Sequence, residues 1–223
     1  MSHTVHPYSH RLGILRDWKS RWFGVNKKYR DYLKADTLIR EYLLKKLADN
    51  HVSVIEIERS DKMFRIIIKT SRPGLIIGRS GEGATKLRKE LVTFMNKKKI
   101  FVEGVEMKID IEEVRSPESD AQLVALMVKE ALEKRMPFRR VLKQMADKVI
   151  ANRNVEGVRI RVGGRLNGAD MARTEDLKKG RVPLQTLRAD IDFARVRASI
   201  PQGDLGIKVW IYRGEIFEDN KNS

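Results

Sequence analysis

The chain has 223 residues, and its 46 Lys and Arg against 30 Asp and Glu give a formal net charge of +16 at pH 7. The absence of cysteine excludes disulfides, thiolate zinc sites, iron–sulfur clusters and a cysteine nucleophile. No run approaches the ~20 apolar residues that cross a bilayer, and residues 1–21 lack the apolar stretch of a secretory signal, so we expect a cytoplasmic protein. The positive charge indicates a polyanionic partner, nucleic acid first and an anionic membrane surface second.

Residues 1–33 combine many bases with aromatic residues and show no clear period. We interpret them as an extended basic arm with at most short helices. Trp18 and Trp22 lie four residues apart in this arm, where they could stack on a base or pack against the following domain.

The next segment, residues 34–112, alternates between helical and strand-like periodicity. Asp36 is predicted to cap its first helix. The predicted elements are a helix from Asp36 to Leu47, strands at 54–58 and 64–70, a glycine loop at 73–81, a helix to Asn96 and a strand at 100–111.

The glycine loop contains Gly78, Arg79, Ser80 and Gly81, a Gly-x-x-Gly pattern. Glycines let the backbone approach a ligand closely, and the loop opens a helix whose free N–H groups favour anions. The tetrapeptide alone is a weak signal, because an ordinary strand-to-helix turn would show it too. In its context of helix, hairpin and following helix it matches a KH domain of the prokaryotic type (type II), which clamps a nucleotide backbone. The pattern of a nucleotide-hydrolysing loop is not met, because Ala84 and Thr85 follow Gly83 where that loop requires Lys and then Ser or Thr.

The second half of the chain, residues 113–213, is predicted to form another α+β domain, and residues 214–223 a short polar tail. Ser116 and Pro117 form a helix-start signal at the boundary. Two amphipathic helices follow, the second of which starts at Pro137. The last third contains predicted strands at 158–162, 187–193 and 207–212, with a long hairpin or loop over residues 163–186.

The second of these helices carries Arg139, Arg140 and Lys143 on one face, because they are three and four residues apart. Three cations within about one turn repel one another, which a polyanion would relieve. A solvated helix face is an equally good interpretation of this spacing alone.

A second basic surface is predicted from Arg159 and Arg161, on one face of a strand, with Arg165 in the turn that follows and Arg173 beyond it. We expect no metal at the N-terminal histidines, which have no carboxylate near them, and no catalytic triad, because all four histidines lie within the first 51 residues.

Several segments together resemble one known family. They are Val5-His6-Pro7, Arg11-Leu12-Gly13, residues 17–22 (DWKSRW), the loop from Pro73 to Gly81, residues 120–125 (DAQLVA), Phe138-Arg139-Arg140, Gly164-Arg165-Leu166, residues 180–184 (GRVPL), residues 187–192 (LRADID) and residues 206–211 (GIKVWI). This order over nearly the whole chain is similar to the bacterial-type small-subunit ribosomal protein S-three family.

The resemblance implies a ribosome-bound, non-enzymatic protein in the head of the small subunit, without cofactor or metal and not a homo-oligomer. Its implied partners are small-subunit rRNA, neighbouring head proteins and mRNA. The position of Arg139, Arg140 and Lys143 would face the mRNA entry channel and help unwinding without hydrolysis. The implied rRNA surface comprises Arg11, Lys19, Arg21, Arg159, Arg161, Arg165 and Arg173. Two alternatives stay open: a free KH regulator of many RNAs, and a lysine-dependent lyase acting on damaged DNA.

Overall fold

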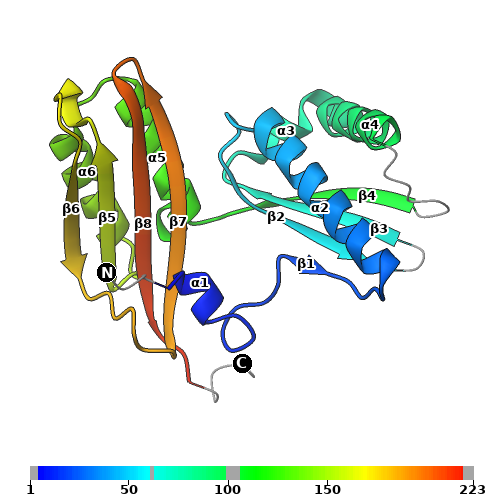
Figure 1. Cartoon of the computed structure of the whole chain (residues 1–223), viewed down its shortest axis with the longest axis horizontal. Helices are drawn as coiled ribbons and strands as arrows, with labels where there is room; N and C mark the ends of the chain where they lie inside the picture. Colours follow the sequence, from blue (N-terminus) through cyan, green and yellow to red (C-terminus); the bar gives the residue numbers. More distant parts are fainter. Residues whose placement is uncertain (1–4, 61–62, 99–105, 218–223) are drawn as a thin grey trace. The chain divides into compact units, whose positions relative to one another are not determined.

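The computed structural model describes residues 5–60, 63–98 and 106–217. The chain forms two compact units: an N-terminal unit of residues 18–115, and a C-terminal unit in which residues 116–223 are joined by residues 1–17 (Figure 1). Each unit is a mixed α and β structure with its own core, so the predicted α+β class is confirmed.

The N-terminal unit contains a four-stranded sheet in the order β1-β2-β3-β4. The strands are β1 (Ser20–Arg21), β2 (Val52–Arg59), β3 (Met63–Thr70) and β4 (Glu106–Glu113). The β2–β3 pair is antiparallel, whereas β1 and β4 run parallel to their neighbours. The start of the predicted strand 100–111 lies outside the described residues.

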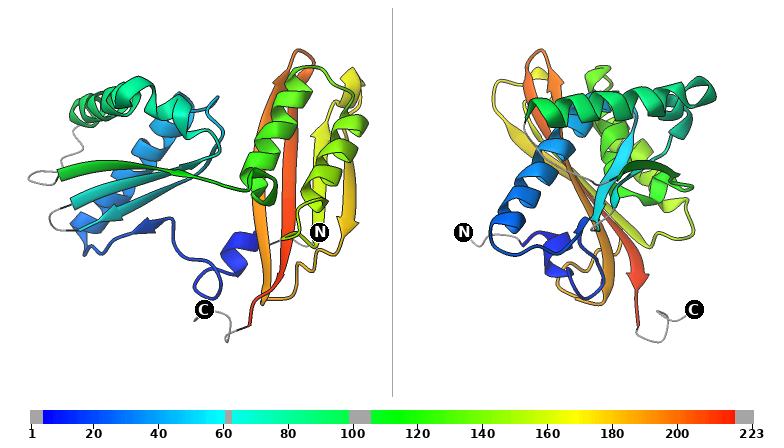
Figure 2. Two further views of the ribbon diagram at one scale, coloured as in Figure 1. Left: turned by 180° about the vertical axis from the view of Figure 1, so that it is seen from behind. Right: turned by 90° about the vertical axis from the view of Figure 1, so that its right-hand side faces the viewer.

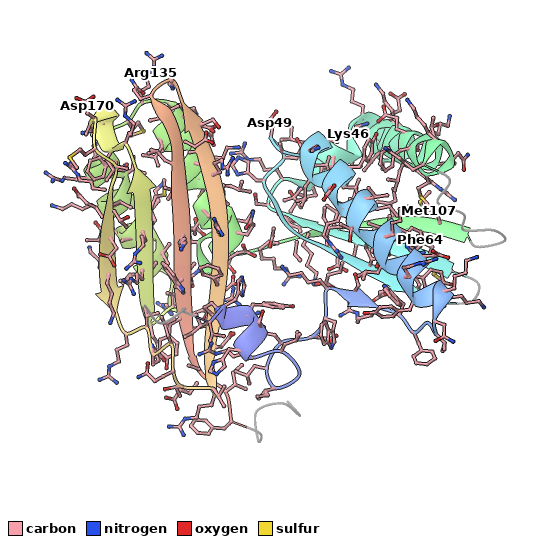
Figure 3. All side chains as sticks on the ribbon, in the orientation of Figure 1. Lys46, Asp49, Phe64, Met107, Arg135 and Asp170 are labelled. Atoms are coloured by element: carbon pink, nitrogen blue, oxygen red, sulfur yellow. The ribbon has the colours of Figure 1, made fainter. Side chains whose placement is uncertain are left out.

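Three helices complete this unit: α2 (Lys27–Lys46), α3 (Pro73–Ile77) and α4 (Glu82–Lys97). One apolar core joins α2, α3 and α4 to the sheet. Phe64 and Met107 are cross-strand partners within this core (Figure 3), and the rings of Tyr42 and Phe94 stack between α2 and α4 at 4.4 Å. The predicted order helix, strand, strand, glycine loop, helix, strand is therefore confirmed.

Helix α2 begins inside the segment that we expected to be an extended arm. Its first eight residues are exposed or half-exposed, so no apolar period announces them. Asp36 is consequently not a helix cap, as predicted, but a buried residue in the middle of α2. Its carboxylate accepts hydrogen bonds from Arg59 and from Trp22 Nε1. Trp22 also contacts the rings of Tyr29 and Tyr32, so packing is its role in this structure.

The C-terminal unit contains an antiparallel sheet in the order β6-β5-β8-β7. Its strands are β5 (Gly157–Gly164), β6 (Arg173–Gly180), β7 (Ala189–Ile200) and β8 (Gly203–Glu215). Helices α5 (Ala121–Glu133) and α6 (Phe138–Ile150) cover one face (Figure 2). The predicted arrangement of two helices on a mainly antiparallel sheet is confirmed, and β6 occupies part of the predicted hairpin region 163–186.

Ser116 and Pro117 do not start α5, contrary to the prediction. They open a short 3-10 turn, η2 (Pro117–Ser119), and α5 is capped instead by Asp120, whose carboxylate accepts a hydrogen bond from Leu123 N at 3.0 Å. Pro at a first turn suits a 3-10 turn as well as an α-helix, because both leave the first N–H groups unpaired.

The described residues from Val5 to Asp17 belong to the C-terminal unit. Helix α1 (Pro7–His10) lies against β7, and the edge of the His6 ring contacts Phe193 at 4.7 Å between centroids. Arg11 is fully buried here. Its guanidinium donates to the carbonyl oxygens of Pro7, Leu184, Thr186 and Ala189.

Candidate nucleic-acid interface

The glycine loop lies between α3 and α4 of the N-terminal unit. Gly78, Ser80 and Gly81 all have positive φ, between 50° and 79°. Glycine adopts this conformation without strain, which explains why two of the three positions are glycine. Ser80 is the non-glycine residue of the loop with a positive φ. Arg79 is exposed, and no ion pair reaches it from the described part of the chain. Its charge therefore stands at the amino end of α4, which is the geometry that favours a phosphate.

Gly83, one turn further on, has a packing role. A Cβ at this position would lie 2.5 Å from the carbonyl oxygen of Ile76 and 2.9 Å from that of Ile77. The close approach of α4 to α3 holds the ends of the loop together. Leu75 and Ile77 of α3 leave apolar surface exposed beside it. The loop thus combines an anion-binding turn with an apolar flank.

The predicted basic face of α6 exists, but one of its three cations is paired. Arg139 lies 3.3 Å from Glu175 of β6, whereas Arg140 and Lys143 are exposed and have no acidic partner in the described ranges. All three line a shallow depression with Gln144. The free charge of this face is therefore carried by Arg140 and Lys143.

Glu175 also contacts Arg173, at 3.2 Å. The hydrogen bond from Arg139 holds the pKa of Glu175 below its usual value, so the ion pair persists to a lower pH than an unshifted glutamate would allow. The sequence showed no acid among these three cations, because Glu175 reaches Arg139 from a strand more than 30 residues away. Arg173 consequently belongs to the helix-covered side of the sheet, next to Arg139.

Arg159 and Arg161 lie on the opposite, open face of the same sheet, since their neighbours Val158, Ile160 and Val162 are buried under the helices. Asp176 of β6 bridges both arginines. Hydrogen bonds from Arg159, reinforced by Arg161, lower the pKa of Asp176. The predicted second basic surface is therefore divided between two faces.

The remaining predicted rRNA residues have varied environments. Arg165 donates to the carbonyl oxygens of Ala169 and Gln202 and so braces its own turn. Arg21 pairs with Glu56 and Glu58 on the charged face of the N-terminal sheet, and Lys19 is exposed.

The prediction that Arg11 contacts rRNA is corrected by its position in the structure. Arg11 is buried and saturated by carbonyl oxygens, and burial lowers the pKa of its guanidinium, with Asp190 opposing that effect. It therefore presents no charge to a phosphate. Its position in a basic N-terminal segment gave no sign of this, because the four carbonyl groups come mostly from residues about 175 positions away.

Replacing Glu175 by Gln should raise the affinity of the chain for single-stranded RNA. The substitution frees Arg139 without removing a cation, and an exposed ion pair is worth about 0.2–1 kcal/mol, so we expect about a 1.5- to 5-fold gain at low salt. Fluorescence anisotropy with a labelled oligonucleotide measures it. Asp49→Asn changes the net charge equally at an exposed site outside this cluster, and a gain of the same size in that variant would assign the effect to net charge alone.

Comparison with known proteins agrees with this architecture. A family model for the KH domain matches residues 38–119, and the model described as "Ribosomal protein S3, C-terminal domain" matches residues 128–211. The fold and these matches define a protein with a KH domain followed by a helix-covered antiparallel sheet.

The chain is 48% identical over 218 residues to the small ribosomal subunit protein uS3 of Xanthomonas euvesicatoria pv. vesicatoria, covering 98% of this chain and 86% of that protein. It is 45% identical over 216 residues to uS3 of Caldicellulosiruptor saccharolyticus, covering 97% and 94%. The chain belongs to the ribosomal protein S3 family. In the described part, none of the helices is long and apolar enough to cross a membrane.

Proposed function

We propose that this chain is a structural constituent of the small ribosomal subunit, where it binds rRNA of the head, contacts neighbouring head proteins and lines the mRNA entry channel. Family membership supports the ribosomal assignment, and the basic surfaces support RNA as the partner. A cytoplasmic, ribosome-bound location follows from this assignment. By function we propose the segments basic arm (1–33), KH domain (34–112), C-terminal domain (113–213) and tail (214–223), although α2 crosses the first boundary and the compact units are divided at residues 17 and 115.

The observation that carries the channel assignment is the exposed pair Arg140 and Lys143 on α6, for which the described residues offer no acidic partner. Each can hold a phosphate of a separated strand, because binding Lys or Arg to a phosphate releases condensed counterions. The protein then stabilises single strands as the message advances, while translocation supplies the work. Arg139 contributes once a phosphate competes with Glu175 for its guanidinium.

Arg140→Gln combined with Lys143→Gln tests this assignment. We expect small subunits that contain this variant to assemble normally, to read an unstructured message at the normal rate and to advance more slowly through a stable hairpin. Reconstituted translation with the two messages measures both rates. Lys45→Gln with Arg153→Gln removes the same charge from exposed sites elsewhere. Equal hairpin and unstructured rates in the α6 variant would contradict the channel role.

For rRNA we propose Lys19, Arg21, Arg159, Arg161, Arg165 and Arg173 as contacts, together with the loop residues Gly78, Arg79, Ser80 and Gly81. The ion pairs that Arg21, Arg159, Arg161 and Arg173 make are partly exposed. Such pairs contribute little stability, so a phosphate can replace the carboxylate. The free-regulator alternative predicts residence off the ribosome, which sedimentation of a lysate measures.

The lyase alternative requires a lysine with a lowered pKa in a pocket. Burial and the nearby charge of Lys86 do lower the pKa of Lys46, which lines a depression between α2, α3 and α4. The ammonium group, however, forms an ion pair with Glu90 of α4. A carboxylate partner favours the protonated, non-nucleophilic form of lysine, so we do not assign an enzymatic function.

A further inference from the structure

The C-terminal sheet has an open face, opposite the one that α5 and α6 cover (Figures 1 and 2). On this face the register places Arg161 of β5 opposite Lys208 of β8, and Lys208 opposite Arg195 of β7. Three cations therefore stand side by side on three neighbouring strands. Strands lie about 4.8 Å apart, so this row spans about 10 Å.

Other cations flank the row on the same face. They are Arg159, Lys178 and Arg197. Asp176 is shared between Arg159 and Arg161, and Asp204 pairs with Arg197 at 3.3 Å. Neither Lys208 nor Arg195 has an ion pair within the described ranges, so the centre of the face carries uncompensated charge.

This arrangement opposes the stability of the isolated fold. Like charges directly opposite one another on paired strands are destabilising, and Lys208 has a cation on each side. Apolar or acidic residues at the same register positions would pair better. The cost is relieved when a polyanion lies across the row.

The rest of the open face favours a nucleic-acid backbone over a protein as this polyanion. Its apolar end is already covered, because Val182 and Leu184 pack on Trp210 and Tyr212. The uncovered end of this face contains the cationic row and the cross-strand pair Gly163 and Gly206. A protein interface needs an apolar centre, whereas facing glycines leave a flat strip on which a sugar–phosphate backbone can lie close to the sheet.

We propose that the open face of the C-terminal sheet, centred on Arg161, Lys208 and Arg195, is a binding surface for the phosphate backbone of double-stranded RNA. This rests on the proposed function and adds an rRNA contact surface that is separate from the α6 face, on the other side of the sheet. The row contacts phosphates of one strand, and Arg159, Lys178 and Arg197 extend the contact on either side.

Lys208→Gln combined with Arg195→Gln tests the proposal in the full chain. The probe is an RNA duplex of about 16 base pairs, and its affinity is measured between about 50 and 200 mM salt. We expect the slope of log affinity against log salt to fall by about 1.8, which is about 0.9 for each phosphate contact, with at least about a fivefold loss of affinity. The melting temperature should stay the same or rise by about 1–4 °C, because the repulsion is removed.

Lys45→Gln with Arg153→Gln serves as the charge-matched control and should change the slope by less than half as much. An identical slope change in the two variants would overturn the proposal, since net charge would then explain it. A melting temperature that falls by several degrees would also overturn it, because the two cations would then stabilise the fold. Competition by polyglutamate as effective as that by the duplex would instead assign the face to an acidic protein.

Co-sedimentation with small ribosomal subunits tests the proposed function, and duplex binding by the open-face variant tests the open-face assignment. If the wild-type chain does not co-sediment with small ribosomal subunits, the proposed function fails. If it co-sediments and the open-face variant binds the RNA duplex as the wild type does, only the open-face assignment fails.

Discussion

Replacing Arg11 by Ala is expected to destabilise the C-terminal unit by about 3–5 kcal/mol, the loss typical when one partner of a buried charged network is removed. Four carbonyl oxygens would lose their donor, and each unsatisfied buried group adds to the cost. Because native stabilities are about 5–15 kcal/mol, the loss is a large share of the total. Hydrogen exchange of β7, where Ala189 accepts the Nε–H bond at 2.6 Å, measures it within this unit.

Arg11→Lys separates this structural role from RNA binding. Lysine keeps the charge but cannot reproduce the planar fork of a guanidinium, so we expect it to lose most of the same stability. Arg153→Ala, at an exposed site, should change stability by less than about 0.5 kcal/mol. An Arg11→Ala variant with normal exchange rates and weakened RNA binding would contradict the buried position of this side chain.

Replacing Asp36 by Ala is expected to destabilise the N-terminal unit by a similar amount, about 3–5 kcal/mol. The change leaves the guanidinium of Arg59, whose side chain is only 7% exposed, without its carboxylate, and removes the acceptor of Trp22 Nε1. Urea unfolding, with hydrogen exchange of β2 to assign the loss to this unit, measures the effect.

The control for this prediction is Asp31→Ala on the same helix. Asp31 is exposed, and its ion pair with Arg30 is long, at 3.8 Å. The loss of Asp31 should therefore cost less than about 0.5 kcal/mol. Asp36→Asn keeps an acceptor oxygen and should fall between the two. Equal losses for Asp31→Ala and Asp36→Ala would contradict the buried pair as the cause, because alanine favours a helix more than aspartate does and the loss of a negative charge would then explain both results.

Several elements were predictable because their cause is local. Alternation of apolar and polar residues indicated β5 and the β2–β3 pair, and apolar stripes indicated α4, α5 and α6. The glycines at 78 and 81 indicated a positive-φ turn, which the structure confirms. The start of α2 was missed because residues 27–34 are largely exposed and leave no apolar period.

The continuation of β7 beyond Phe193 was also missed, and Arg195 and Arg197 with it. The alternation of Ala194, Val196 and Ala198 with these arginines is the signal that would have extended the strand. Once β7 is extended, the register with β8 places Arg195 beside Lys208. Strand pairing of this kind is a non-local property that a single-strand pattern does not contain.

The sequence by itself determined that this is a basic, cysteine-free α+β protein of two domains with a glycine loop at a helix start, since charge, periodicity and turn chemistry depend on composition and near neighbours. Only the tertiary structure decided which cations are available to a ligand. Burial makes Arg11 unavailable, and ion pairs with Glu175 and Asp176 engage four of the predicted arginines. Strand register assembles a cationic row that no local pattern revealed. The physical reason is that the free energy of a charge depends on the dielectric and the partners around it, which folding brings from distant parts of the chain.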